Sequence, residues 1–392
     1  MAQEGHVAIA PIDAAERASR VRRVQAELRR RDLAAAVLTE RANFEYVTGY
    51  WLPPLWSSFT RVLAAIVPID GDPLLLLPAF VADGGAETTG WQVEAYATLE
   101  RGAGELLADA LRNAGLARER IGVERGRETR LATTVEELER LSAALPDATL
   151  ADAAEVMWTA RAIKSRAEID RLRIACEANR AAFAEGYGSP RAGQTERDVA
   201  AQMFAAGTRD VEAEGAWVAP GWIGITSGAG SYNRFVAGPR PRRLEPGDML
   251  WADLGFTADG YWSDTCRAAV VGGPSAQQVD RQRRIDDATN HGIALLRPGV
   301  AIADVAREMR RVSAAHGLAS LGFGRLGHGI GLTATEPPSV VEHDPTILEA
   351  GMVITVEPAA VHDDGLYCAE QIVVVGDPPE LLSTEPTALR TI

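Results

Sequence analysis

Hydrophobic and polar positions in the first 150 residues alternate between helical and extended spacing. Val21, Val24 and Leu28 recur every three or four residues among arginines and glutamates, which predicts an amphipathic surface helix. Short apolar runs bounded by turn residues, such as those of segment 70–73, predict strands. The predicted helices cover 14–30, 105–114 and 135–145, and the predicted strands cover 34–38, 62–68, 74–78 and 121–123. This alternation predicts an α/β N-terminal domain over residues 1–155.

The second half of the chain combines longer helical patterns with strand-like apolar runs. A basic segment around Arg161, Lys164 and Arg166 leads into it, so the domain boundary is expected near residue 155. The predicted helices cover 167–184, 276–296 and 302–315, and the predicted strands cover 249–254, 266–271, 352–356 and 371–375. Residues 156–392 are therefore predicted to form a separate α+β domain.

Composition and charge narrow the class of protein. Of the 392 residues, 46% are hydrophobic and 24% charged, which is ordinary globular composition. The 40 basic and 54 acidic side chains give a net charge of −14, which disfavours nucleic acid and anionic membranes as partners. No run reaches the roughly 18 to 20 apolar residues that span a bilayer. Three widely spaced cysteines form no disulfide framework, and the first ten residues lack the basic start of a signal peptide, so a cytoplasmic location is expected.

Segment 247–271 places two carboxylates on neighbouring predicted strands. A turn around Ala258, Asp259 and Gly260 joins the strands, and Asp253 and Asp264 lie at nearly equal distances from it. In a hairpin they would lie about opposite each other and share one face. Facing carboxylates repel each other inside apolar strands, and a divalent cation with oxygen ligands relieves that repulsion. The alternative is that one or both aspartates are exposed at the turn.

Three later residues also have side chains that can bind a divalent cation. His328 lies between glycines in LGHGIGL, Glu357 follows the predicted strand 352–356, and Glu370 precedes the predicted strand 371–375. Taken singly, a loop histidine or a solvated glutamate at a strand end is the commoner explanation. Taken together, four carboxylates and one imidazole make up the ligand set of a two-metal hydrolytic site, in which ions roughly 3.5 to 4 Å apart activate a water molecule.

The flanks of these residues resemble a known superfamily. The matching segments are WADLG, SDTCR, LGHGIGL with TEPP, GMVITVEP and AEQIVVV. They resemble the superfamily of methionine aminopeptidase, Xaa-Pro aminopeptidase, prolidase and creatinase. Segments NFEYVTGYW and RAIKSRAEIDRLRIACEAN resemble its two-domain prolidase and creatinase branch. The resemblance covers nearly the whole chain and implies a pita-bread fold for the C-terminal domain.

The resemblance implies a role for each of the five residues. Asp264 and Glu370 would bridge two divalent ions, Asp253 would complete one ion's ligands, and His328 with Glu357 would complete the other's. Glu357 is also the candidate general base, because it is a carboxylate next to the attacking water. Manganese is the favoured ion, with cobalt, zinc and iron as alternatives, since a mixed nitrogen and oxygen shell accepts all four.

Four positions depart from the pattern of the peptidases that the chain resembles. Thr335 and Val236 occupy the places of two histidines that contact the scissile peptide there. Thr335 can donate one weaker hydrogen bond and is kept as a catalytic candidate, and losing such a donor costs on the order of 100-fold in rate. Cys368 replaces an arginine, and Gln371 replaces an aspartate.

Two other histidines in the sequence could supply an imidazole in place of the two that are absent. His343 and His362 are the candidates, although each is more often a solvent-exposed residue when taken alone. Spacing does not decide between the two interpretations.

Candidate substrate-binding residues come from two segments. Segment 217–236 contains Trp222, Tyr232, Arg234 and Val236, whose aromatic and guanidinium groups suit a small, partly apolar anion. The alternative is a strand and turn packed on the core. Trp56 lies in a segment that resembles the loop by which dimeric relatives reach the partner's site, so a homodimer is expected.

Three functions follow as alternatives. The first is a dinuclear metal-dependent hydrolase of the Xaa-Pro peptidase type that cleaves an amide bond of a small or short-peptide substrate. The second keeps the site but changes the reaction to hydrolysis of a non-peptide C–N bond or to a lyase reaction, as in creatinase, ectoine hydrolase and dimethylsulfoniopropionate lyase; Thr335, Val236 and Cys368 favour it. The third is a non-catalytic binding protein, which a full carboxylate cluster makes electrostatically costly.

Overall fold

The chain folds into two compact units, Pro11–Arg161 and Ala162–Ile392. The computed structural model describes residues 12–51, 61–97, 101–130, 132–188, 193–209, 211, 215–232, 234, 238–318 and 324–392. Trp56 and Val236 therefore lie outside the described residues. Helix α6 (Ala154–Ala162) ends at the division between the units. No helix in the described ranges combines the length and the apolar content that crossing a membrane requires.

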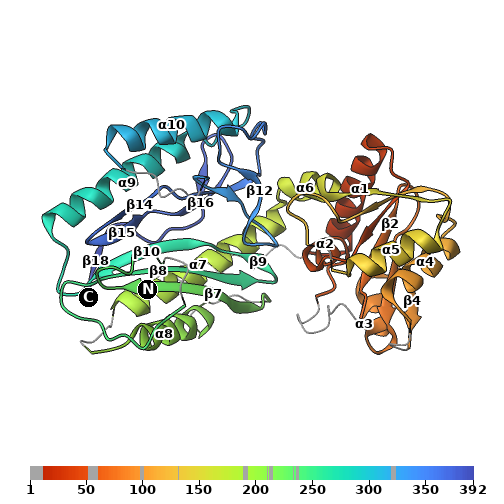
Figure 1. The fold of residues 1–392 in the computed structure, drawn as a ribbon, viewed down its shortest axis with the longest axis horizontal. Helices are drawn as coiled ribbons and strands as arrows, with labels where there is room; N and C mark the ends of the chain where they lie inside the picture. The colour runs from red at the N-terminus through yellow and green to blue at the C-terminus, as the bar shows by residue number, and fades with distance from the viewer. Residues whose placement is uncertain are drawn as a thin grey trace, which may run out of the picture. The chain divides into compact units, whose positions relative to one another are not determined.

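The N-terminal unit is built on a mixed sheet (Figure 1). Its strands follow the order β4-β3-β2-β1-β5-β6 within the described residues, with parallel pairing of β1 to β5, β5 to β6 and β3 to β4. The strands are β1 (Ala35–Leu38), β2 (Ala64–Pro68), β3 (Leu74–Pro78), β4 (Gln92–Tyr96), β5 (Arg120–Val123) and β6 (Thr149–Asp152). The helices besides α6 are α1 (Ala14–Arg30), α2 (Arg41–Thr48), α3 (Ala79–Thr89), α4 (Ala103–Asn113) and α5 (Val135–Ala144).

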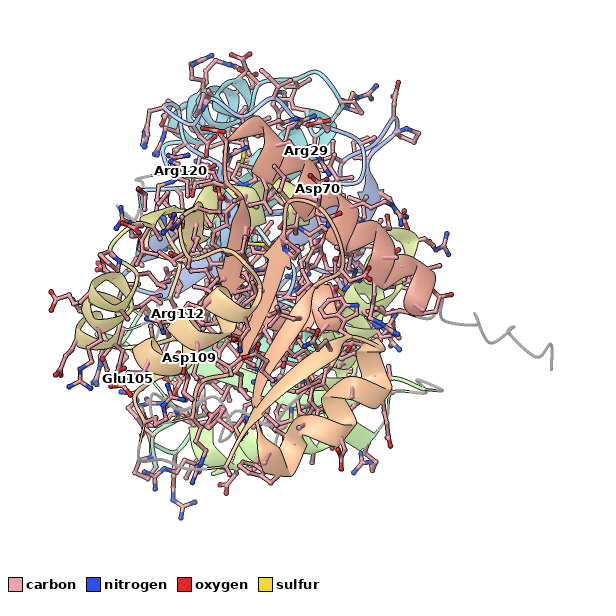
Figure 2. The ribbon with its side chains drawn as sticks, turned by 90° about the vertical axis from the view of Figure 1, so that its right-hand side faces the viewer. Arg29, Asp70, Glu105, Asp109, Arg112 and Arg120 are labelled. Carbon is pink, nitrogen blue, oxygen red and sulfur yellow. The ribbon has the colours of Figure 1, made fainter. Side chains whose placement is uncertain are left out.

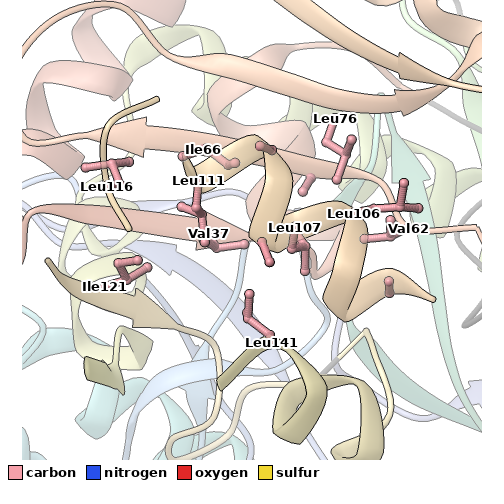
Figure 3. Close-up of a cluster of buried hydrophobic side chains, with 14 of the residues drawn as sticks. Val37, Val62, Ile66, Leu76, Leu106, Leu107, Leu111, Leu116, Ile121 and Leu141 are labelled. Carbon is pink, nitrogen blue, oxygen red and sulfur yellow. The ribbon is translucent and has the colours of Figure 1, made fainter. Parts of the chain in front are cut away.

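A cluster of buried leucines and β-branched residues joins this sheet to α4 and α5. Figure 3 shows Leu107 and Leu111 of α4 and Leu141 of α5 facing the strand residues Val37 and Ile121. Burying each such side chain contributes about 1.5 to 3 kcal/mol. The predicted α/β core of this unit is therefore present, and it is closed by residues from the predicted elements.

The surface of the N-terminal unit carries paired charges. Figure 2 shows Arg29 beside Asp70 and Arg112 beside Asp109, and both pairs are ion pairs between exposed side chains. Such exposed pairs each contribute about 0 to 1 kcal/mol, so they keep the surface polar and add little stability.

The C-terminal unit contains two larger sheets and a hairpin. Within the described residues the first sheet has the order β18-β10-β8-β7 with β9 on β8, the second has the order β12-β11-β13-β16-β17, and β14 pairs with β15. The first sheet consists of β7 (Val218–Ser227), β8 (Met249–Ala258), β9 (Tyr261–Trp262), β10 (Thr265–Val270) and β18 (Arg390–Thr391). The other strands are β11 (His328–Gly329), β12 (Glu336–Ser339), β13 (Val353–Val356), β14 (Ala359–His362), β15 (Gly365–Cys368), β16 (Gln371–Val374) and β17 (Glu380–Leu381).

Helices and the hairpin bury both faces of the first sheet. Helices α7 (Arg166–Gly188) and α8 (Glu196–Arg209) cover one face (Figure 1). There Phe183 and Met203 pack on Leu250, Leu254 and other apolar side chains. The β14–β15 hairpin and α9 (Ala276–Ala294) lie on the other face. Helix α10 (Ile302–Ala315) packs with α9 over the second sheet. Separate buried apolar clusters thus pack the sheets against their helices and the hairpin.

Candidate metal centre

A tight hairpin brings the two aspartates onto one face of the first sheet. Asp259 and Gly260 form its turn with φ values of 45° and 83°, and both positive values match the Asp-Gly turn expected from the sequence. Asp253 pairs with Cys266 across the strands, so Asp264 lies two positions from the residue opposite Asp253. Alternate residues share a face of a strand, so the two carboxyl side chains lie on the same face, and each affects the pKa of the other. The predicted shared face is therefore observed, with a diagonal rather than a direct pairing.

The glycine before His328 permits close packing of β11. Gly327 has a φ of 152°, and a Cβ added there would lie 2.0 Å from the carbonyl oxygen of Thr355. The His328 amide donates to Thr355 Oγ1 at 3.0 Å, so the same neighbouring residue holds the backbone of the histidine. A side chain at position 327 would push His328 away from this contact.

The hydrogen bonds of His328 leave one ring nitrogen ready to bind a metal. Its Nδ1 lies 2.9 Å from the carbonyl oxygen of Gly329, which requires a proton on Nδ1. Its Nε2 lies 3.6 Å from Asp264 Oδ2 and 3.5 Å from Glu357 Oε1. Burial lowers the pKa of His328 to about 4, so the ring is neutral at pH 7. A neutral imidazole with its lone pair on Nε2 is the form that ligates a metal.

The two glutamates enter the same space from the second sheet. Glu357 follows β13, and its amide donates to the carbonyl oxygen of Leu326 at 2.9 Å. Glu370 directly precedes β16 and is buried. One ligand atom each of Asp264, His328 and Glu370 lies within 4.8 Å of the others. These contacts, together with those to Asp253 and Glu357, bring all five predicted ligand residues into one cluster, hereafter the carboxylate cluster.

Burial and mutual repulsion disfavour ionisation of the carboxylate cluster. Burial raises the pKa of Asp253 to about 6 and, with the repulsion from Asp253, the pKa of Glu357 to about 7. The same two causes raise the pKa values of Asp264 and Glu370 well above the usual range. Asp253 Oδ1 and Glu370 Oε1 are buried without a hydrogen-bond partner among the described residues. Four carboxyl groups with orphaned oxygens and one free imidazole nitrogen fit divalent cations.

Trp222, predicted to bind substrate, lies on the face of the first sheet that carries Asp253. Its ring is near Gly255, where an added Cβ would lie 2.4 Å from Trp222 Cζ3, and Gly255 shares a strand face with Asp253. The ring packs on Trp262 with 5.5 Å between the ring centroids. The Trp262 amide donates to the carbonyl oxygen of Gly331, which follows His328 in the glycine-rich segment. Trp262 was not among the predicted site residues, although it lies two positions before Asp264.

The other predicted substrate residues lie in different environments. Tyr232 is 4% exposed in the core, and its hydroxyl accepts a hydrogen bond from the Met249 amide at 3.1 Å. The alternative of a turn packed on the core therefore describes the position of Tyr232. Arg234 is exposed, and Val236 and Trp56 fall outside the described residues.

Thr335 accepts a hydrogen bond from an arginine that was not among the predicted site residues. Thr335 is half-buried, and its Oγ1 accepts a hydrogen bond from Arg325 Nη2 at 3.3 Å. The charge of Arg325 lowers the pKa values of Asp264 and Glu357 against the larger effect of burial. The sequence feature that could have indicated Arg325 is its position three residues before His328.

A second overlooked arginine reaches the last metal-binding strand. Arg267 of β10 donates to the carbonyl oxygen of Glu370 at 2.7 Å and to Gln371 Oε1 at 3.0 Å. Cys368, at the place where related peptidases carry an arginine, is buried. The guanidinium next to Glu370 thus comes from another strand. All three cysteines are free, as predicted.

The two candidate replacement histidines form no ion pair with the cluster carboxylates among the described residues. His343 is exposed, and His362 packs edge-on against Tyr367 with 5.6 Å between the ring centroids.

Comparison with known proteins agrees with this geometry. The model of the creatinase/prolidase N-terminal domain matches residues 20–163, and the model of metallopeptidase family M24 matches residues 170–377. The crystal structure of dipeptidase PepE from Mycobacterium ulcerans has a TM-score of 0.84 and 27% identity, over 98% of this chain and all of that one. The predicted fold, an α/β N-terminal domain followed by an α+β pita-bread domain, is confirmed.

Two further relatives extend over most of the chain. The Xaa-Pro dipeptidase of Lactobacillus helveticus is 26% identical over 325 residues, covering 82% of this chain and 84% of the relative. A prolidase from Thermococcus sibiricus has a TM-score of 0.84 at 21% identity, over 98% of this chain and all of that one. The chain is a metal-dependent hydrolase and belongs to metallopeptidase family M24, in the two-domain branch of creatinase and prolidase.

Proposed function

We propose that the protein is a dinuclear hydrolase that cleaves an amide bond of a small, peptide-like substrate. The observation that carries the proposal is the carboxylate cluster itself, in which His328 offers an unprotonated Nε2 and buried oxygens of Asp253 and Glu370 lack partners. The similarity to Xaa-Pro dipeptidases supports a peptide-like substrate. A structural cluster without cations would leave these groups buried and unsatisfied, at a cost in stability.

The ligands divide between two ions in this proposal. Asp264 and Glu370 would serve both ions, Asp253 would complete one set of ligands, and His328 with Glu357 would complete the other. Divalent ions, when bound, polarise the scissile carbonyl group and make water a nucleophile at neutral pH. Manganese is the first choice, with cobalt, zinc and iron as alternatives that the same donor set accepts.

The protein's own groups then orient substrate and move protons. The side chain of Glu357 is 27% exposed, so it can take a proton from water at the open side of the cluster. Thr335 Oγ1 accepts from Arg325 and keeps its own hydroxyl proton to donate to the substrate carbonyl. Trp222 and Trp262 supply an apolar wall.

Metal analysis and a substrate panel test the proposal. We expect two divalent ions per chain, and loss of both the ions and turnover in the D264N/E370Q variant. Xaa-Pro dipeptides, Xaa-Pro tripeptides and small amides, assayed with Mn²⁺, then define the substrate. Turnover that survives complete removal of metal contradicts a metal-dependent reaction, and metal-loaded protein without any turnover supports the non-catalytic alternative.

A second candidate is hydrolysis of a non-peptide C–N bond, or a lyase reaction, at the same site. Thr335 in place of an imidazole, and Cys368 in place of an arginine, are the observations that favour it. Turnover of small non-peptide amides with no turnover of any prolyl peptide would establish this candidate over the first.

The proposal includes a homodimer in the cytoplasm that acts on small molecules. The net charge of −14 disfavours binding to nucleic acid or to anionic lipid, and three free cysteines are typical of a reducing compartment. Light scattering should give twice the 41.9 kDa chain mass. If Trp56 reaches the partner's site, a Trp56 variant should raise KM at unchanged metal content.

A further inference from the structure

A buried amide lies on the opposite face of the first sheet from the two aspartates. Asn179 of α7 has no exposed surface, and its helix neighbours Ala182 and Phe183 belong to the apolar cluster that includes Leu254 of β8. Because successive side chains of a strand point to opposite faces, Asp253 points away from this helix. Burying an amide among apolar side chains costs free energy unless its polar atoms are hydrogen-bonded.

The Asn179 amide is hydrogen-bonded to three residues of the hairpin formed by β8, β9 and β10. Its Nδ2 donates to the carbonyl oxygen of Leu254 at 2.9 Å and to Thr265 Oγ1 at 2.7 Å. Its Oδ1 accepts from Ser263 Oγ at 3.0 Å. Since a carbonyl oxygen can only accept, the bond to Leu254 fixes which end of the amide is the donor. One side chain thus joins the two long arms of the hairpin.

The three partners are neighbours of two proposed metal ligands. Leu254 follows Asp253 in β8, and Ser263 and Thr265 lie on either side of Asp264. All three partners are buried, so water does not compete for these hydrogen bonds. The amide on α7 therefore restrains the backbone next to both carboxylates from the far side of the sheet.

The strand pairing is irregular beside Asp264. A hydrogen-bonded antiparallel pair normally exchanges two backbone bonds. The Ser263 amide donates to the Phe256 carbonyl oxygen at 2.9 Å, whereas the Phe256 amide donates to Ser263 Oγ at 3.0 Å, in the place of the second backbone bond. A Cβ added to Gly255 would lie 2.6 Å from the Ser263 carbonyl oxygen, so that oxygen is turned out of the ladder. The hydroxyl group that replaces it is the one bonded to Asn179.

We propose that Asn179 is a positioning residue that sets the separation of the Asp253 and Asp264 carboxylates and so allows the site to hold two divalent ions together. The side-chain bonds from α7 supply the restraint that the interrupted backbone ladder lacks. The inference rests on the proposed dinuclear function and deepens it by naming a residue that supports the shared ligand. Because Asp264 would serve both ions and Asp253 only one, a shift between them should weaken one ion more than the other.

Titration of the metal-free protein with Mn²⁺, followed by calorimetry and electron paramagnetic resonance, tests the proposal. We expect the wild type to bind two ions and to give the spectrum of a spin-coupled pair, since two Mn²⁺ ions that share ligands are coupled. Leucine is branched like asparagine but has no polar side-chain atoms, so N179L removes all three contacts. Its affinity for the second ion should fall by about tenfold to a hundredfold, the usual cost of removing the support of a ligand. Isolated Mn²⁺ should then be seen at concentrations that fill both wild-type sites.

A matched pair of threonine variants separates positioning from loss of stability. T265V removes one of the Asn179 contacts and should weaken the second ion in the same direction, by less than N179L does. Thr226 of β7 is also buried, and its Oγ1 donates to the Ser231 carbonyl oxygen at 3.0 Å. T226V should lower the melting temperature as T265V does, and it should leave both Mn²⁺ affinities and the coupled spectrum unchanged.

The possible results distinguish this inference from the function on which it rests. N179L and T265V variants that bind two ions with wild-type affinity overturn the positioning role and leave the dinuclear site intact. Equal weakening of Mn²⁺ binding in T226V and T265V overturns it as well, because the effect then follows stability. A wild type that binds fewer than two ions contradicts the dinuclear function and the inference together. If N179L does not fold, the comparison of T265V with T226V decides. Loss of the coupled pair in N179L, in a protein that hydrolyses no amide, supports the positioning role and contradicts the hydrolase proposal.

Discussion

Arg267 connects the strand after Asp264 with the strand after Glu370 through one buried guanidinium. It is 2% exposed, donates to the Glu370 carbonyl oxygen at 2.7 Å and pairs with Glu385 at 3.1 Å. Removing one partner of a buried ion pair costs about 3 to 5 kcal/mol, because the other charge remains buried. We expect R267M to lower the free energy of unfolding by this amount and to weaken metal binding, as urea denaturation and metal titration would measure.

A surface arginine provides the matched control. Arg180 pairs with Glu177 at an exposed site, so R180M should change the unfolding free energy by less than about 1 kcal/mol. If the R267M/E385L double variant regains stability but not metal affinity, Arg267 positions Glu370 and is more than a structural partner of Glu385. Equal recovery of both would reduce its role to the ion pair.

Glu124 makes the N-terminal unit sensitive to pH. It is 1% exposed, and burial, with the repulsion from Glu40, raises its pKa from 4.5 to about 7 despite hydrogen bonds from Thr39, Glu40 and Asn43. Between pH 4.5 and 7 the folded chain keeps a proton that the unfolded chain has lost, so stability falls as the pH rises. A shift of this size corresponds to about 3 kcal/mol, at about 1.4 kcal/mol per pKa unit.

The E124Q variant isolates this contribution. Because glutamine does not titrate, the stability of the wild type relative to E124Q should fall between pH 4.5 and 7 and stay constant above pH 7. Urea denaturation at each pH gives the difference. A difference that stays constant across this window would show that the hydrogen bonds offset burial and that Glu124 is ionised in the folded state.

At the scale of single residues, the sequence predicted those side chains that lie in recognisable motifs. The five cluster residues could be named because their order and flanks resemble a family, and their side chains do converge. Arg325 and Arg267 were missed since a lone arginine carries no periodic or spacing signal. Their roles depend on contacts between distant segments, such as the bond from Arg325 to Thr335. Tyr232 could not be separated from the core for the same reason.

At the scale of elements, the close packing of the glycine-rich segment before His328 depends on a single residue, Gly327. Gly327 has a φ of 152° and lies so close to β13 that an added Cβ would be 2.0 Å from the carbonyl oxygen of Thr355. We expect G327A to displace His328 and to weaken metal binding by about tenfold to a hundredfold, the usual effect of disturbing the support of a ligand. Titration of the metal-free protein with Mn²⁺ measures this.

The control for G327A is a glycine where an added side chain has room. Gly188, at the end of α7, has no atom within 4 Å of an added Cβ, so G188A should leave metal affinity unchanged. Equal loss in both variants would indicate a general effect of the substitution. Unchanged affinity in G327A would mean that β11 can shift without moving the imidazole.

Some elements with regular apolar spacing were predictable, whereas helix α8 and several short strands were not. Helices α1 and α10 and strand β3 begin and end at the predicted residues, because their apolar spacing is regular and turn residues bound them. Strands β11, β12, β14 and β15 have two to four residues each and were absent from the prediction. They form through pairing with distant partners, as Gly329 does with Ile354, so the local sequence holds little information about them.

At the scale of the whole molecule, the cluster belongs to one unit only. Asp253, Asp264, His328, Glu357 and Glu370 all lie within Ala162–Ile392, whereas Pro11–Arg161 has its own sheet and core. The sequence predicted two domains from the change in pattern near residue 155, and the contacts divide after Arg161. The difference arises because α6 packs as part of the first unit up to Arg161.

Metal binding should therefore stabilise the two units unequally. Bound ions stabilise only the folded state to which they bind, by about 2.7 kcal/mol per site when free metal is a hundred times its Kd. We expect chelation to speed amide hydrogen exchange in β8, β10 and β16 and to leave the core of β1 and β5 unchanged, as exchange followed by mass spectrometry would show. The D264N/E370Q variant should show no response to metal, and its metal-free form should be more stable than the metal-free wild type because two fewer buried carboxyl groups repel each other. Equal loosening of both units on chelation would mean that the carboxylate cluster is not where the ions act.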